Sequence, residues 1–106
     1  MGAVGTVSLS SVRIHPAALE EAQAAVDWYR QRSPRAAARV LDELDRAMER
    51  LRNAPSEFPG YDFGTRRAIL RRFPYLVIFR ETAAGAEIIA VAHGRRRPRY
   101  WQDRIG

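Results

Sequence analysis

The sequence "YLVIFRETAAGAEIIAVAH", residues 75–93, decides which fold this chain can adopt. Two runs within it, 75–81 and 87–93, consist mostly of apolar residues, as in strands that are buried on both faces. The segment between them, "TAAGA" at 82–86, is short and contains a glycine, which predicts a hairpin loop. We therefore expect two antiparallel strands at the centre of a sheet.

A third strand is expected immediately before this hairpin. The stretch "RRAILRRF", residues 66–73, alternates in part between apolar and basic side chains. Successive side chains of a strand point to opposite faces, so Arg71 and Arg72 should lie on opposite sides of the sheet. The preceding residues 53–64 contain two prolines and two glycines and are expected to form a loop.

An amphipathic helix is predicted in the first third of the chain. Pro16 suits the first position of a helix, because its φ angle is already helical. Four apolar residues then recur at helical spacing and should form the buried face: Leu19, Ala22, Val26 and Tyr29.

A second helix is predicted directly after the first. Ser33 can accept a backbone hydrogen bond as its N-cap, and Pro34 suits its first position. Two helices joined so closely should form an antiparallel hairpin. The apolar stripe of the second helix comprises Ala37, Val40, Leu41, Leu44, Ala47, Met48 and Leu51.

The remaining segments complete an α+β fold. The stretch "SSVRIH" alternates in part, which predicts a short strand near 9–15. The tail "RPRYWQDRI", residues 97–105, is expected to form a short helical turn that packs through Trp101 and Ile105. The element order is then β-α-α-β-β-β, with the helical hairpin packed on one face of a small, mainly antiparallel sheet.

The composition narrows the chemistry that the chain can perform. It has 106 residues and no cysteine, which excludes disulfides, thiol catalysis and cysteine-based zinc sites. Its two histidines, His15 and His93, have no metal-ligand spacing, and no cofactor motif is present. We expect one cytoplasmic domain over 11–106, preceded by a flexible lead-in, 1–10, without the features of a signal peptide.

The positive charge of the chain is concentrated toward its carboxyl end. All 18 basic residues are arginine, and the formal net charge is +6. Residues 1–53 carry a net charge of +1 and residues 54–106 a net charge of +5. Such a field attracts anionic partners, either nucleic acid or an acidic protein segment.

The strongest candidate for a binding site is the stretch "GRRRPRYW", residues 94–101. Guanidinium groups this close together repel one another, so the stretch is expected to serve an anionic partner that carries phosphate or carboxylate groups. Its candidate contact residues are Arg95, Arg96, Arg97, Arg99, Tyr100 and Trp101.

Three further residues are open to interpretation. Trp28 lies one position off the apolar stripe of the first helix, where it either packs in the core or anchors a partner. His93, at the end of a strand, is either a structural residue bonded to backbone or an imidazole base. His15 is expected to cap or border the first helix.

Taken together, these segments resemble the RelE/ParE superfamily of toxins from type II toxin–antitoxin modules. The resemblance covers nearly the whole chain after residue 11 and depends on the combination of "DWYRQRSP", "RRFPYLVIF" and "AVAHGRRRPRYW". Within the superfamily, these features are closer to the ParE and plasmid-stabilisation branch. The resemblance implies a toxin that arrests growth unless a short antitoxin with an acidic amphipathic segment wraps across it.

The superfamily implies two different targets. ParE-like members poison DNA gyrase and have no established hydrolytic site, whereas RelE-like members cleave mRNA on the ribosome. For cleavage, the resemblance assigns Arg72 and Arg95, and His93 is the only imidazole that could join them. The lysines of the RelE branch are missing, and the register places its carboxy-terminal tyrosine at Trp101 rather than Tyr100.

We therefore expect a ParE-like toxin that inhibits gyrase by binding, without a metal, a cofactor or catalytic residues of its own. Its contacts with the target or the antitoxin would include Arg72 and Trp28 as well as residues 95–101. The alternatives are a ribosome-dependent mRNA endonuclease and a decayed toxin that only binds its antitoxin.

Overall fold

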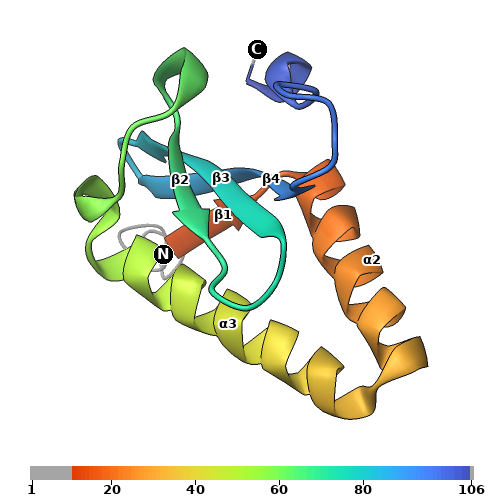
Figure 1. The fold of residues 1–106 in the computed structure, drawn as a ribbon. Coiled ribbons are helices and arrows are strands. Elements are labelled where there is room, and N and C mark those ends of the chain that lie inside the picture. Colours follow the sequence, from red (N-terminus) through yellow and green to blue (C-terminus); the bar gives the residue numbers. More distant parts are fainter. Residues whose placement is uncertain (1–10, 106) are drawn as a thin grey trace.

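The computed structural model describes residues 11–105, in which two long helices cover a four-stranded sheet (Figure 1). The expected lead-in, 1–10, lies outside the described residues. The order of elements confirms the predicted β-α-α-β-β-β fold. In chain order they are β1 (Ser11–Ile14), α2 (Pro16–Arg32), α3 (Pro34–Asn53), η1 (Pro55–Glu57), η2 (Asp62–Gly64), β2 (Arg66–Ile69), β3 (Tyr75–Thr82), β4 (Gly85–His93) and η3 (Gln102–Arg104), where η marks a short 3-10 helix.

The sheet has the strand order β1-β4-β3-β2. β3 is antiparallel to both of its neighbours, whereas β1 runs parallel to β4 and pairs Ser11 with Gly85. β3 and β4 are therefore the central strands, as their apolar runs predict. Their hairpin is tighter than expected, because Thr82 pairs with Gly85 and leaves only Ala83 and Ala84 in the turn. Gly85 has a φ of 139°, a conformation that glycine adopts without strain.

Both helices begin with a side-chain cap followed by proline, as predicted. The Nδ1 atom of His15 accepts a hydrogen bond from the N–H of Ala17 at 3.1 Å, and the Oγ atom of Ser33 accepts one from the N–H of Ala36 at 3.2 Å. Ser33 also ends α2, so a single residue separates the two helices. No helix within residues 11–105 is long and apolar enough to cross a membrane.

The sheet is covered on both faces. On one face α2 and α3 pack against buried side chains that include Phe79 and Ile88. On the other face the segment after β4 places Trp101 against Ile78 and Ile89. Burial on both faces explains why β3 and β4 are nearly continuous apolar runs.

The buried face of α2 differs from the predicted stripe. Leu19 is 45% exposed, whereas Ala18 and Ala25 are buried. Small alanine side chains let the helix backbone approach the sheet closely, so the contact face is centred on them rather than on the larger residue. The second helix shows one similar difference, since Leu41 is exposed beside the buried Val40.

The strand β2 ends at Ile69 and does not continue to residue 73 as predicted. Arg71 and Arg72 therefore lie in the turn between β2 and β3, and the prediction that they lie on a strand, on opposite faces of the sheet, is wrong. A carboxylate oxygen of Glu43 accepts the backbone N–H groups of both arginines, at 2.8 and 3.4 Å. These N–H groups are then satisfied by a side chain of α3 instead of a neighbouring strand. Pro74, which lacks an N–H, completes the turn.

Candidate functional site

A groove between α2 and the end of β4 brings together four of the predicted site residues. Its volume is about 700 Å³. Apolar and aromatic walls beside a basic rim suit a partner that carries both apolar and acidic side chains. We call it the α2–β4 groove, and its lining consists of Glu21, Ala24, Ala25, Trp28, Tyr29, Pro74, Tyr75, Val91, His93, Gly94, Arg95 and Arg96.

Trp28 forms the exposed aromatic wall of the α2–β4 groove. The residue is 49% exposed, so it is not part of the core. The guanidinium carbon of Arg32 lies 3.7 Å from the centre of its ring, and Arg32 donates a hydrogen bond to the Trp28 carbonyl at 2.9 Å. The ring of Tyr29 meets it edge-on, with centroids 4.9 Å apart. These contacts hold the indole at the surface, where it can anchor a partner.

The four arginines of the 94–101 stretch do not form one unpaired cluster. Arg96 stacks on Tyr100, with 3.8 Å between its Cζ atom and the ring centroid. Arg99 has a φ of 62°, and its Nη1 atom lies 3.3 Å from the carboxylate of Asp62. Arg95 and Arg96 line the groove, whereas Arg99 does not. Within the fold, Arg96 is therefore stacked on Tyr100 and Arg99 is paired with Asp62.

His93 ends β4 and turns the chain toward the arginines. Its Nδ1 atom accepts a hydrogen bond from the backbone N–H of Arg95 at 3.0 Å. Its ring meets Tyr75 edge-on, with centroids 5.1 Å apart. This hydrogen bond from backbone to a ring nitrogen is the one that the structural interpretation of His93 predicts. The lone pair of Nδ1 is consequently engaged by the fold.

Glu21, which the sequence analysis does not single out, holds the segment after β4 in place. Its oxygens accept hydrogen bonds from the Tyr100 hydroxyl at 2.6 Å, from Arg104 at 2.9 and 3.0 Å, and from the N–H of Val91 at 2.9 Å. The strand β1 ends at Ile14, so β4 has no strand neighbour on its β1 side at Val91, and Glu21 bonds to that edge instead. No local pattern marks Glu21, because its partners lie 70 to 83 positions away.

This network also sets the protonation of its members. Burial raises the pKa of Glu21, but the hydrogen bonds from Arg104, Tyr100 and Val91 lower it more, and the pKa lies below its usual value. Burial raises the pKa of the Tyr100 hydroxyl, and the hydrogen bond to Glu21 raises it further. At neutral pH, Glu21 is therefore a carboxylate and Tyr100 a hydrogen-bond donor to it.

Trp101 lies in the core rather than at the surface. It is 2% exposed and packs against the face of the sheet that the helices leave free. The rings of Tyr61 and Phe63 lie beside it, each with its centroid 6.1 Å away. The prediction that Trp101 packs the tail is confirmed, but a partner does not reach the buried ring, so we leave it out of the candidate binding site.

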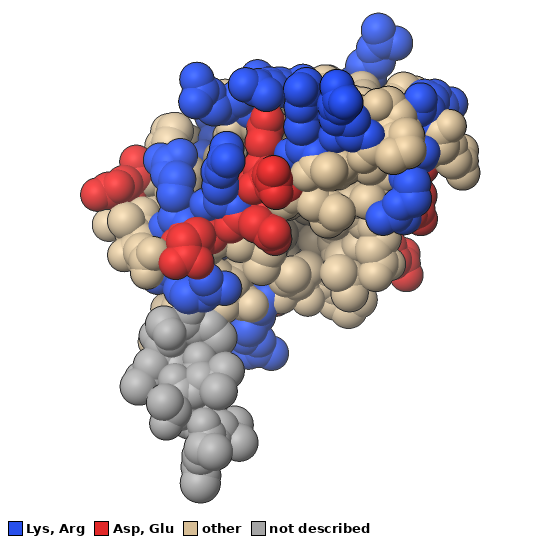
Figure 2. Space-filling view, turned by 90° about the horizontal axis from the view of Figure 1, so that it is seen from below, with Lys and Arg blue, Asp and Glu red and all other residues tan. Residues whose placement is uncertain are grey.

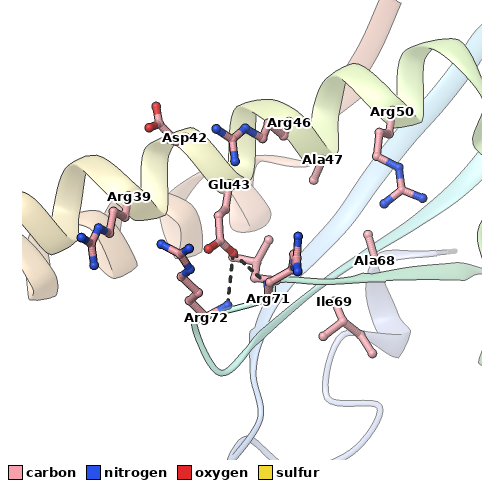
Figure 3. A pocket seen from close by; sticks show the side chains of 11 residues that line it. Arg39, Asp42, Glu43, Arg46, Ala47, Arg50, Ala68, Ile69, Arg71 and Arg72 are labelled. Atoms are coloured by element: carbon pink, nitrogen blue, oxygen red, sulfur yellow. Dashed lines mark hydrogen bonds between the residues drawn. The ribbon is translucent and has the colours of Figure 1, made fainter.

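Arg72 lies apart from His93 and Arg95, in a second groove between α3 and the β2–β3 turn (Figure 3). This groove has a volume of about 480 Å³. The structure therefore does not bring the three candidate catalytic residues into one groove. We call this second groove the α3–β2 groove, and its lining consists of Arg39, Asp42, Glu43, Arg46, Ala47, Arg50, Ala68, Ile69, Leu70, Arg71 and Arg72.

The side chains of the α2–β4 groove are suited to recognising a partner. It combines an exposed indole with guanidinium groups, while His93 and Tyr100 already form hydrogen bonds within the fold. Within residues 11–105, no group of three or more His, Asp or Glu side chains is arranged to hold a metal ion.

Comparison with known proteins identifies the family. The family model described as "ParE toxin of type II toxin-antitoxin system, parDE" matches residues 12–98. No curated protein matches the chain. Seven chains of solved structures match it. One, described as "Chromosomal ParDE TA system from P. aeruginosa", has a TM-score of 0.69 and 19% identity, covering 81% of this chain and 97% of that chain, and so shares the fold. The family match extends from β1 through both helices and all four strands to the arginine-rich turn, and the chain therefore belongs to the ParE toxins of type II toxin–antitoxin systems.

Proposed function

We propose that this toxin arrests growth by binding DNA gyrase, without breaking a bond itself, and that a cognate antitoxin neutralises it. Membership of the ParE family supports a toxin of the gyrase-binding branch. The P. aeruginosa structure is described as a ParDE system, which supports an antitoxin as the partner of this chain too.

The observation that carries the proposal is that Nδ1 of His93 and the hydroxyl of Tyr100 each form a hydrogen bond within the fold. Cleavage of RNA through its 2′-hydroxyl needs a base for that hydroxyl and an acid for the leaving oxygen. Nδ1 of His93 accepts the N–H of Arg95, and Tyr100 donates to Glu21 with a raised pKa. The remaining candidate, Arg72, lines the other groove. This arrangement favours a mechanism of binding over cleavage of mRNA.

We further propose the α2–β4 groove as the surface that a protein partner uses. Trp28 offers an exposed apolar anchor, and Arg95 and Arg96 lie on the rim beside it. Arg97, which is also exposed, extends the basic surface, and Tyr100 supports Arg96 by stacking. An acidic amphipathic segment would cover the indole and pair its carboxylates with these arginines.

The first test is a DNA-damage reporter, read while the toxin is induced without antitoxin, together with a supercoiling assay on purified gyrase. Binding to gyrase predicts growth arrest, a rising reporter signal and inhibited supercoiling. The His93→Ala variant should keep all three effects, provided that circular dichroism shows it folded, because no step of this mechanism uses the imidazole as a base.

Two other outcomes would contradict the proposal. Arrest with a silent reporter, together with mRNA cleavage on ribosomes that His93→Ala abolishes, would identify an endonuclease. The absence of arrest in a chain that still binds its antitoxin would identify a decayed toxin.

A further inference from the structure

The α3–β2 groove contains five arginines that form no salt bridge with any described residue. Arg39, Arg46 and Arg50 extend from α3 on the side that faces the β2–β3 turn, and Arg71 and Arg72 rise from the turn opposite them (Figure 3). Seven further arginines also form no salt bridge with a described residue, but no other groove gathers five such arginines in its lining. Six other arginines form salt bridges: Arg30, Arg52, Arg66, Arg80, Arg99 and Arg104.

The two carboxylates of the groove, Asp42 and Glu43, form no salt bridge with these five arginines. Glu43 directs one oxygen at the backbone N–H groups of Arg71 and Arg72, at 2.8 and 3.4 Å, and so supports the turn. The side chain of Asp42 points away from the turn (Figure 3). From the side on which α3 lies, basic side chains gather along one edge of the molecule, with acidic side chains beside and between some of them (Figure 2). The lining of the groove itself contains five arginines and two carboxylates. The groove therefore presents a surplus of positive charge.

We infer that the α3–β2 groove binds the phosphate backbone of duplex DNA without regard to base sequence. This function goes beyond the binding of gyrase as a protein. Arginine offers a planar fork of donors that matches the oxygens of a phosphate. Binding of this kind depends on charge and spacing, and the groove provides both.

The spacing of the arginines suits a DNA strand. From Arg39 to Arg50, α3 rises by about 16 Å at its usual rise per residue. One strand of a duplex carries a phosphate every 3.4 Å or so along the axis, so about five phosphates span the same length. The lining contains no aromatic side chain on which unpaired bases could stack, which favours a duplex over a single strand.

One residue of the groove suits a different occupant. Ile69 is 64% exposed at the outer edge of the sheet, where an acidic peptide would cover it. A phosphate backbone gains little from that contact, because it has no apolar side chain to place there. The variant Ile69→Ser therefore distinguishes peptide from DNA.

The test measures fluorescence anisotropy of a labelled duplex of about 20 base pairs, titrated with the full-length toxin at several salt concentrations. We expect equal affinity for two unrelated sequences and a steep loss of affinity with salt. The double variant Arg46→Gln, Arg71→Gln should weaken binding about tenfold and lower the log–log salt slope by about two. Ile69→Ser should bind DNA like the parent.

The matched control removes the same charge outside both grooves. The double variant Arg30→Gln, Arg35→Gln should change the affinity by less than about twofold, because these side chains contact no phosphate in the proposed complex. An equal loss in both double variants would show attraction by net charge alone and overturn the inference. So would the absence of binding at low salt.

A third outcome would identify the other occupant. If the groove variant and Ile69→Ser both weakened antitoxin binding while DNA binding stayed intact, the groove would be a site for an acidic peptide and the inference would be wrong. No gyrase is present in this assay, so its outcome is independent of the proposed inhibition of gyrase.

Discussion

Glu21 accepts hydrogen bonds from β4 and from two residues of the segment that follows it. Its side chain and that of Arg104 are 15% and 17% exposed, so water screens their charges only weakly. The turn of residues 94–99 lies between Val91 and Tyr100, both of which bond to Glu21. One carboxylate on α2 therefore holds the strand before the arginines and the tyrosine after them.

The variant Glu21→Gln should lower the free energy of unfolding at pH 7 by roughly 2–4 kcal/mol, because the mostly buried Arg104 is left without its counter-ion. The folded-state pKa of Glu21 is lowered, so its contribution is fully present above the ordinary glutamate pKa. That contribution is lost as the pH falls through the folded value.

Urea denaturation at neutral and at acidic pH checks this prediction. The difference between parent and Glu21→Gln should shrink at the lower pH. The neighbouring Glu20→Gln serves as the control, because Glu20 is exposed and should change little at either pH. A difference that did not depend on pH would contradict the role of the ion pair.

At the scale of helices and strands, local patterns predict which elements form but not how they meet. The caps at His15 and Ser33 act within a few residues, so the sequence predicts both helix starts. The prediction that Leu19 is buried is wrong because the face of α2 that contacts the sheet is centred on two small alanines. The prediction that Arg72 lies on a strand is wrong because Glu43, on α3, accepts a hydrogen bond from its backbone N–H.

The same limit applies to the candidate site. The sequence alone is enough to select Trp28 as an aromatic candidate contact, because it lies one position off the apolar stripe of its helix. It also selects Arg95 and Arg96 as basic candidate contacts, because they belong to a run of arginines. Their meeting in one groove depends on α2 packing beside the end of β4. The burial of Trp101 depends on the rings of Tyr61 and Phe63, which precede β2. No residue near Trp101 in the sequence predicts that these rings lie beside it.

The α2–β4 groove gives a prediction about the antitoxin. Trp28→Ala should weaken antitoxin binding by about tenfold or more, because a half-exposed anchor loses its contact area. The double variant Arg95→Gln, Arg96→Gln should weaken it too and make the affinity less dependent on salt.

Isothermal titration calorimetry over a range of salt concentrations measures both effects. Leu19→Ala, on α2 but outside the groove, is the matched control and should bind like the parent. Affinities that none of these substitutions changed would remove the groove from the proposed function.

For the whole molecule, stability depends on two apolar layers, one on each face of the sheet. The second layer is small, and Trp101 is its largest buried side chain. Trp101→Ala should lower the free energy of unfolding by about 3–5 kcal/mol, a large share of the stability of a small domain. Phe63→Ala, which removes an exposed ring beside Trp101, should cost much less. Chemical denaturation measures both variants, and a loss below about 1 kcal/mol for Trp101→Ala would contradict this account.

The parallel pairing of β1 with β4 has a consequence for the order in which the toxin is synthesised and folds. Ser11 and Gly85 are paired although 74 positions separate them. The edge strand β1 therefore cannot join the sheet until β4, the last strand of the chain, has been synthesised. The α2–β4 groove is not complete in a nascent chain that stops short of β4, because Val91 and His93 line it. In the proposed function, the chain can therefore bind a partner through the α2–β4 groove only after β4 has been synthesised and has paired with its neighbours.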